Sequence, residues 1–228
     1  MSVSLRCYST SLGCPKNRVD TERLLGSLGV ALVPVESPDE AELVFINTCA
    51  FIQPATEESV RTIAQAIADI EELPKRPLLA VAGCLVGRYH AEDLAPELPE
   101  VDLWLDNSDL EAWPAMLARK LGLPEPTVPG RILSTGPSYA WLKISDGCRH
   151  ACSFCAIPNI RGGHRSHCKD MIVREARALL DQGVKELNLV AQDLTEWGCD
   201  LDGKQDLRTL LDGLLPLQGL ERLRLMYL

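Results

Sequence analysis

Three cysteines in the second half of the chain lie close enough together to bind one metal centre. They are Cys148, Cys152 and Cys155, in a C-x₃-C-x₂-C pattern after the apolar run 140–144. Three thiolates on a loop can bind a four-iron cluster, which usually has four cysteine ligands, and leave one iron open to chelate a small molecule. A zinc site closed by a fourth ligand is the alternative. The candidates for that fourth ligand are His150, His164, His167 and Cys168.

A second set of cysteines is spread through the first half of the chain. Cys14, Cys49 and Cys84 follow one another at intervals of 35 residues. The last two each come directly after an apolar run that predicts a buried strand. Because the carboxyl ends of parallel strands meet at one edge of a sheet, equal repeats would bring all three cysteines together. Three separate buried cysteines are the alternative. Neighbours typical of loops favour a site: Gly13, Pro15, Asn47, Thr48 and Gly83.

Other residues near these sets are weaker candidates. Phe154 lies between two of the loop cysteines and is either a shield for a cluster or a core residue. Gln192 and Asp193 follow a predicted strand, where β/α barrels bind ligands, although they could equally cap a helix. Cys7, Cys168 and Cys199 fit neither set, and we interpret them as free thiols. Basic residues gather around the loop and could hold a carboxylate or phosphate or form a solvated surface. They are Arg149, His150, Arg161, His164, Arg165, His167 and Lys169.

The elements that must position these residues alternate between strand and helix. Apolar runs rich in β-branched residues predict strands at 3–5, 43–46, 78–82, 101–105, 140–144, 187–190 and 222–228. Helical spacing predicts helices at 20–28, 54–73, 107–121, 170–182 and 206–215. Ser108 is the predicted N-cap of the third of these helices. We expect one long loop from the strand at 140–144 to Lys169. This alternation predicts a parallel sheet that helices cover on both faces.

A linker divides the chain into two predicted domains. Residues 122–137 hold four prolines and three glycines, which suit neither a helix nor a central strand. We expect an α/β fold: a doubly wound parallel-sheet domain over 1–121, and over 138–228 the first half of a β/α barrel. Residues 1–121 contain 10 basic and 19 acidic side chains, whereas 122–228 contain 13 of each. The first domain therefore suits a phosphate backbone poorly, and we expect no nucleic-acid partner.

Composition excludes several classes of protein. The chain has 228 residues, 46% of them hydrophobic and 24% charged, as in ordinary globular domains. The longest apolar run has nine residues, too few for the roughly 20 that cross a bilayer, so we expect no membrane association. The N-terminal segment lacks the pattern of a signal peptide, which favours the cytoplasm. In that reducing compartment nine cysteines indicate metal or redox chemistry rather than disulfides.

Several segments resemble a known enzyme family. The C-x₃-C-x₂-C pattern with an aromatic residue before its third cysteine resembles the radical S-adenosylmethionine enzymes. Within them, the methylthiotransferases are similar at SLGCPKNRVDTE (11–22), INTCAFIQPATEES (46–59) and AGCLVGRY (82–89). The match continues through LKISDGCRHACSFCAIPNIRGGHRS (142–166), GVKELNLVAQDLTEWG (183–198) and RLRLMYL (222–228). The resemblance therefore covers essentially the whole chain.

The resemblance implies cofactors and ligands. Cys148, Cys152 and Cys155 would bind a radical-generating [4Fe-4S] cluster with S-adenosylmethionine on its open iron. Cys14, Cys49 and Cys84 would bind an auxiliary [4Fe-4S] cluster that handles sulfur. One S-adenosylmethionine would methylate that sulfur. Another, cleaved with electrons from a reductant protein, would give the radical that takes hydrogen from the substrate carbon. Phe154 and Gln192 would lie near S-adenosylmethionine.

The resemblance also points to a substrate. One branch of the family modifies an adenosine of transfer RNA, with Gly-Cys-Gln-Met-Asn as its usual first motif. The other modifies the β-carbon of an aspartate in a small-subunit ribosomal protein. Gly13-Cys14-Pro15-Lys16-Asn17 resembles the second branch, and the acidic first domain suits a basic protein substrate. Transfer-RNA modification and a non-catalytic iron–sulfur or zinc module are the alternatives.

This chain departs from the family pattern in two respects. The family usually has Arg-Ser-Arg-Pro where this chain has Arg165-Ser166-His167-Cys168. Family members are about twice as long, with a six-strand partial barrel and a C-terminal substrate-binding β-domain. The resemblance therefore implies a C-terminally truncated member, and we expect little or no turnover from these 228 residues alone.

Overall fold

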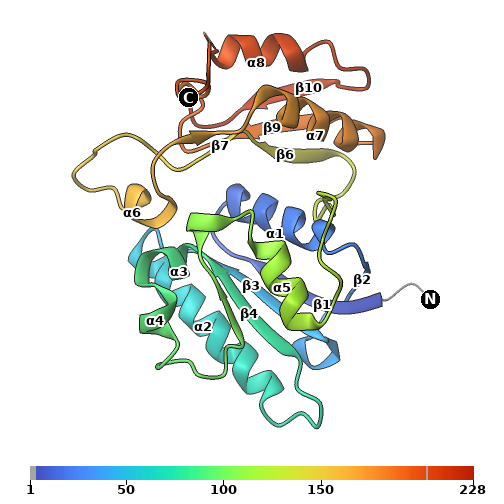
Figure 1. Ribbon diagram of the computed structural model, residues 1–228, viewed down its shortest axis with the longest axis vertical. Helices are drawn as coiled ribbons and strands as arrows, with labels where there is room; N and C mark the ends of the chain where they lie inside the picture. The colour runs from blue at the N-terminus through green and yellow to red at the C-terminus, as the bar shows by residue number, and fades with distance from the viewer. Residues whose placement is uncertain (1–3, 204) are drawn as a thin grey trace. The chain divides into compact units, whose positions relative to one another are not determined.

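The computed structural model describes residues 4–203 and 205–228, which divide into two compact units (Figure 1). The first unit ends at Ile132 and the second begins at Leu133. The division falls inside the segment predicted as a linker. Among the described helices, none has the length and apolar character needed to span a membrane.

The first unit is built on a five-stranded parallel sheet in the order β2-β1-β3-β4-β5. Its strands are β1 (Ser4–Ser11), β2 (Ala31–Pro34), β3 (Leu43–Thr48), β4 (Leu78–Gly83) and β5 (Leu103–Leu105). The chain leaves β1 for β2 on one side and returns to β3 on the other. The strand order thus reverses between β1 and β3, the place where open α/β sheets bind ligands. The predicted doubly wound sheet is confirmed.

Helices cover both faces of this sheet. Successive side chains of β3 point to opposite faces, and all of them are buried. Leu43 and Phe45 pack with residues of α1 (Pro15–Ser27) and α5 (Trp113–Leu121), and α2 (Gln53–Ile70) packs on the opposite face (Figure 1). All six β3 residues are buried, as expected for a parallel strand covered on both sides. Shorter elements complete the unit: η1 (Pro38–Glu40), α3 (Cys84–Tyr89), α4 (Ala91–Leu94) and η2 (Asn107–Asp109).

The second unit contains a three-stranded parallel sheet in the order β10-β9-β6. Its strands are β6 (Tyr139–Lys143), β9 (Glu186–Val190) and β10 (Arg222–Leu225), and its main helices are α7 (Lys169–Asp181) and α8 (Leu207–Leu214). Ala140, Leu142, Leu187 and Leu189 point to the helices and form one core with them. The other face carries Asn188 opposite Trp141 in the register. Two successive βαβ units therefore share one sheet.

Several details differ from the prediction, including the unpredicted strand β2. The segment between β6 and α7 is not a plain loop, since it contains α6 (Ile157–Arg161) and a small antiparallel pair, β7 (Ser145–Asp146) and β8 (Arg165–Ser166). Ser108 is not an N-cap, because its backbone N–H donates to the Asp106 carboxylate at 2.6 Å and α5 begins only at Trp113. Asn47 and Thr48, taken as loop residues, are fully buried in β3.

Candidate metal centres

The dispersed cysteines lie at one edge of the first sheet. Cys14 is the N-cap of α1, three residues after β1, Cys49 directly follows β3, and Cys84 opens α3 directly after β4. Because β1, β3 and β4 are neighbours in a parallel sheet, all three positions lie at the carboxyl ends of adjacent strands. The first two flank the point where the strand order reverses. The equal spacing in the sequence thus corresponds to neighbouring strand ends.

Two glycines allow the cysteine-bearing turns to approach one another. A Cβ on Gly13 would lie 2.5 Å from both the Cβ and the Sγ of Cys49, and its φ is +81°. A Cβ on Gly83 would lie 2.2 Å from Asn47 Oδ1 and 2.6 Å from the carbonyl oxygen of Thr48, with φ at +99°. Both positions therefore need glycine for space and for backbone conformation. The turn before Cys14 consequently lies against the Cys49 side chain.

A buried network of side-chain amides connects the same three turns. Asn17 Nδ2 donates to the carbonyl oxygens of Leu12 (2.9 Å) and Thr48 (2.8 Å). Asn47 Nδ2 donates to Asn17 O at 2.8 Å. Asn107 Nδ2 approaches Cys84 Sγ at 3.7 Å. Sequence analysis gave Asn107 no role in the site, since it lies 23 residues beyond Cys84.

The first edge fits an iron–sulfur cluster in donor chemistry and surroundings. Cys49 and Cys84 are 8% and 4% exposed, and Cys14 is half-buried. Within the described residues, the groups whose ligand atoms lie within 4.8 Å of one another include neither cysteine triad. Among the described side chains, Asn47 Oδ1 and Asn107 Oδ1 are buried there with no hydrogen-bond partner.

The cysteine loop of the second unit starts from a tight turn. Gly147, with φ at +66°, comes so near Gly163 that a Cβ would lie 2.1 Å from the Gly163 carbonyl oxygen. The Cys148 N–H donates to the carbonyl of Gly162 at 3.2 Å, and the His150 N–H donates to Cys148 Sγ at 3.4 Å. Cys148 and Cys155 are half-buried and Cys152 is exposed. Both ends of the loop are therefore held while its cysteines remain accessible.

Two acidic residues after β9 hold this loop. Glu196 pairs with Arg149, and Asp193 Oδ2 lies 3.1 Å from His150 Nε2. The pKa of Asp193 is lowered, because hydrogen bonds from Thr195 and His150 outweigh the effect of burial. Sequence analysis identified Asp193 only as a strand-end ligand or cap and gave Glu196 no role. They lie 43 and 47 residues from their partners His150 and Arg149, so the sequence carries no local signal for these contacts.

Asp146 anchors the start of the cysteine loop inside a buried group of cations. Its Oδ1 accepts from Lys143 Nζ at 2.8 Å and from Arg161 at 3.3 Å, and its Oδ2 lies 3.0 Å from His167 Nε2. Burial raises the pKa of Asp146, but Lys143, His167 and Arg161 together hold it well below its usual range. Arg161 is thus a structural partner of Asp146, in place of the predicted anion ligand.

The three histidines among the predicted fourth ligands of the cysteine loop contact other residues. Both ring nitrogens of His167 have partners, Asp146 and the carbonyl of Lys143 (3.1 Å). His164 Nε2 lies 3.0 Å from Ser166 Oγ, and His150 contacts Asp193. Cys168 is exposed at the N-cap of α7. These contacts favour the three-ligand interpretation of the loop.

The remaining candidates fall in three places. Phe154 is 89% exposed beside the loop cysteines, so it is not a core residue. Gln192 is half-buried just beyond β9. Cys7 lies within β1, and burial raises its pKa to about 12. All nine cysteines belong to the described part of the chain, and none of them forms a disulfide.

Comparisons with known proteins identify relatives over the whole chain. Residues 6–106 match UPF0004, described as an uncharacterized protein family. A ribosomal protein uS12 methylthiotransferase RimO from Nitratidesulfovibrio vulgaris is 69% identical over 221 residues, which cover 97% of this chain and 51% of that protein. The RimO of Lawsonia intracellularis is 59% identical over 228 residues, or 100% of this chain and 52% of the relative. The chain thus spans about half the length of the curated relatives it matches.

Solved structures share the fold at low sequence identity. The cobalamin-dependent S-adenosylmethionine radical enzyme OxsB matches with a TM-score of 0.56 and 14% identity, over 97% of this chain and 38% of OxsB. The radical S-adenosylmethionine methyltransferase TsrM from Kitasatospora setae gives 0.54 and 12%, over 86% of this chain and 48% of TsrM. The two-unit α/β fold is therefore one that occurs in radical S-adenosylmethionine enzymes. The sequence identities show that the chain is similar over its length to about half of each of these RimO methylthiotransferases.

Proposed function

We propose that this chain binds two [4Fe-4S] clusters and S-adenosylmethionine, and serves in methylthio transfer to an aspartate of ribosomal protein uS12. The observation that carries the proposal is the meeting of Cys14, Cys49 and Cys84 at the ends of three neighbouring strands. A separate C-x₃-C-x₂-C loop lies in the other unit. The name of the 59–69% identical relatives supports uS12 as the substrate.

In this proposal, Cys148, Cys152 and Cys155 hold one cluster and the three strand-end cysteines hold the other. When bound, these groups supply the radical and the sulfur. Asn107 Nδ2 donates to Cys84 Sγ, and the His150 N–H donates to Cys148 Sγ. Phe154 and Gln192 are the proposed neighbours of S-adenosylmethionine.

The acidic first unit supports a protein substrate over transfer RNA. The whole negative excess of the chain lies in residues 1–121, and ribosomal proteins are basic. Complementary charge speeds the encounter of two proteins, whereas a nucleic-acid backbone would be repelled. A reductant protein, which supplies electrons, is the second proposed partner, and the cytoplasm is the proposed compartment.

Anaerobic reconstitution with iron and sulfide tests the cluster assignment. The intact chain is expected to hold about eight iron atoms, as two four-iron clusters. Changing Cys148, Cys152 and Cys155 together to Ala should halve the iron content, and so should the same change at the strand-end triad. Cys168→Ser is the matched control, since this thiol is exposed and belongs to neither set. Stoichiometric zinc without iron uptake would contradict the proposal.

A longer relative with the same first motif tests the substrate. We expect mass spectrometry to find the methylthio group on an aspartate of uS12. Modification of a transfer-RNA adenosine would overturn the substrate and leave the cluster assignment intact.

A further inference from the structure

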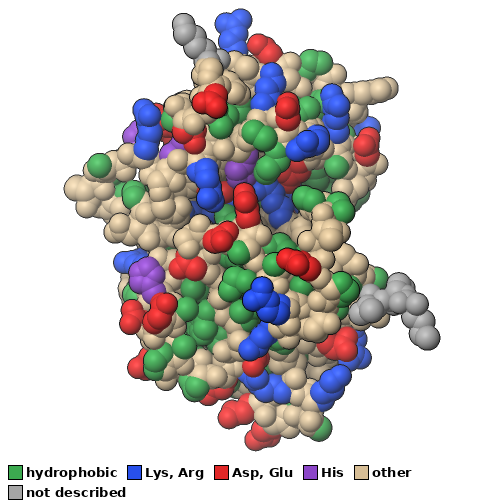
Figure 2. Space-filling view, in the orientation of Figure 1, with side chains coloured by type: hydrophobic (Ala, Val, Ile, Leu, Met, Phe, Trp, Pro, Cys, Tyr) green, Lys and Arg blue, Asp and Glu red, His purple; other side chains and the backbone are tan. Residues whose placement is uncertain are grey.

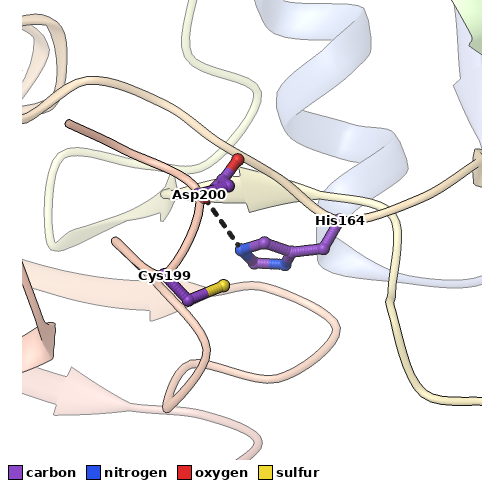
Figure 3. A group of neighbouring side chains, drawn as sticks. All are labelled: His164, Cys199 and Asp200. Carbon is purple, nitrogen blue, oxygen red and sulfur yellow. Dashed lines mark ion pairs between the residues drawn. The ribbon is translucent and has the colours of Figure 1, made fainter.

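His164, Cys199 and Asp200 form a group of side chains that the proposed clusters do not use. One ligand atom from each lies within 4.8 Å of the others, so nitrogen, sulfur and oxygen donors are neighbours (Figure 3). His164 directly precedes β8, and the other two residues belong to the segment after β9. We propose that this group binds a divalent transition metal ion, Zn²⁺, as a third metal site of the chain.

The distances suit an ion held by these donors. His164 Nε2 and Asp200 Oδ1 are 3.5 Å apart. Two ligands at roughly 2.1 Å from a tetrahedral zinc ion lie about 3.4 Å from each other. The nitrogen and oxygen donors are thus near the separation that zinc imposes, and an ion would replace the contact of His164 Nε2 with Ser166 Oγ at 3.0 Å. Imidazole, thiolate and carboxylate are the three side-chain ligand types found in zinc sites.

Hydrogen bonds fix the two segments that carry the ligands. The Ser166 N–H donates to Asp200 Oδ2 at 2.8 Å, so the other carboxylate oxygen faces His164. The Gly198 N–H donates to Ser166 Oγ at 2.9 Å, and Trp197 Nε1 donates to the His167 carbonyl at 3.0 Å. The Asp200 carboxylate is therefore oriented before any ion binds.

Exposure gives the ion a route and an open coordination position. The His164 side chain is only 4% exposed, whereas Cys199 and Asp200 lie at the surface. An ion would enter on the side of Cys199, whose thiol loses its proton to solvent on binding. With three protein ligands, water or an added ligand would fill the fourth position.

A second group of possible metal ligands is less suited to bind an ion. His150, Asp193 and Glu196 also lie within 4.8 Å, but they hold the cysteine loop already described. Asp193 Oδ1 accepts from both the N–H and the hydroxyl of Thr195, and Glu196 pairs with Arg149. None of the three proposed zinc ligands belongs to the cysteine triad of that loop, and the Cys199 thiol lies beside Glu196 and Arg149.

Metal binding by single-cysteine variants tests the proposal. The intact chain, Cys199→Ser and Cys168→Ser are dialysed against buffered zinc, and bound zinc is counted by mass spectrometry. Cys199→Ser should bind one equivalent less than the intact chain, and Cys168→Ser should bind the same amount. We expect an affinity loss above about 100-fold, because even outer-shell partners of zinc ligands are worth roughly 10–100-fold. The difference in bound zinc between the variants is measured with and without iron loading, so the test does not depend on the proposed clusters.

Cobalt spectroscopy provides a second readout. Co²⁺ bound at this site should show thiolate charge-transfer absorption that disappears in Cys199→Ser and weakens strongly in His164→Gln. Thermal unfolding by circular dichroism checks that both variants fold. Equal zinc binding and unchanged cobalt spectra in the folded Cys199→Ser and Cys168→Ser variants would overturn the proposal.

Discussion

At the scale of single residues, the cysteine loop depends on a carboxylate that contacts no candidate cofactor. Asp146 is two residues before Cys148 and faces three cationic or ionisable partners, with its side chain 6% exposed. Lys143 and Arg161 are 1% and 2% exposed, so neither cation can turn to water for compensation. A buried charge without its partner is costly, which makes Asp146 necessary even if the ion group adds little net stability.

The Asp146→Asn variant isolates this effect. It removes the carboxylate charge that faces the buried side chains of Lys143 and Arg161, and we expect a loss of about 3–5 kcal/mol in the free energy of unfolding. Urea denaturation followed by circular dichroism measures it. Glu221→Gln is the control, because Glu221 and Lys185 form an exposed pair at 3.6 Å and exposed pairs contribute only about 0–1 kcal/mol. Equal stability of the two variants would show that water or other groups compensate the buried cations.

Gly83 tests whether the strand-end turns must touch. Gly83→Ala introduces a methyl group against Asn47 Oδ1 and the Thr48 backbone at a φ of +99°. Gly29→Ala has a similar positive φ of +67° with nothing within 4 Å of the new methyl group. Both substitutions should cost roughly 1–3 kcal/mol for the strained backbone. Gly83→Ala should lose a further 1–3 kcal/mol or so from overpacking, as measured by thermal unfolding. Identical losses would mean that the turn relaxes without harm.

At the scale of elements, a segment predicted as linker lies bound on α1. The Arg131 guanidinium pairs with Glu22 at 2.7 Å, and both side chains are buried. The Ile132 N–H donates to the Glu22 carbonyl at 3.1 Å, and the Gly130 N–H donates to Ser27 Oγ at 3.1 Å. Gly26 permits this approach, since its Cβ position would lie 2.4 Å from the backbone nitrogen of Arg131. The proline and glycine content of this segment therefore predicted that it forms no helix or strand, but it did not predict the contact with α1.

Alanine substitution at two helical glycines should change the free energy of unfolding in opposite directions. Gly26→Ala in α1 would press a methyl group against backbone atoms of Arg131, so we expect destabilisation of roughly 1–3 kcal/mol. Gly213→Ala in α8 meets Lys169 Cε at 2.6 Å, the far end of a flexible side chain that can move. Here the usual helix preference should prevail and stabilise by roughly 0.5–1 kcal/mol. Thermal unfolding of both variants measures these changes. Stabilisation of both variants, or destabilisation of both, would contradict the contacts described for these two glycines.

The sequence predicted the helices and strands that have a clear hydrophobic pattern of their own. It missed the strands that form only through contacts with residues far away in the sequence. The runs at β3 and β4 are apolar and flanked by turns, so periodicity sufficed for them. β2 was missed because it is a short edge strand with mostly exposed residues. The pair β7 and β8 has two residues in each strand and exists only through contacts across 20 residues.

The same division holds for the candidate site. Strand-end reasoning placed Cys49 and Cys84 because each follows its own apolar run. Asn107 and Glu196 approach their partners from 23 and 47 residues away, so no local pattern marks them. Asp200 lies 36 residues from His164, and the proposed zinc site could not be derived from spacing alone.

At the scale of the whole molecule, each cysteine set lies within one unit. The strand-end triad belongs to the unit that ends at Ile132, and the loop triad to the unit that begins at Leu133. Acidic and basic side chains are interspersed over the face drawn in Figure 2, while the sequence places the net charge of −9 in residues 1–121. The two proposed clusters differ in what holds their ligands, since three strands position one set and a single loop carries the other.

This difference predicts that damage to the first core removes one cluster only. Phe45→Ala empties a fully buried position in β3, the strand that leads to Cys49, and large core truncations of this kind cost about 3–5 kcal/mol. Because three separate strand ends must stay in register to hold the first set, reconstituted Phe45→Ala should bind about four iron atoms in place of about eight. The loop ligands span only residues 148–155 in the other unit and should keep their cluster.

Phe51→Ala, 46% exposed and two residues after Cys49, is the control and should retain all the iron. Iron analysis and electron paramagnetic resonance measure both variants. Full iron retention by a destabilised Phe45→Ala would show that the first set does not depend on the sheet. Loss of all the iron would show that the two units do not hold their clusters independently.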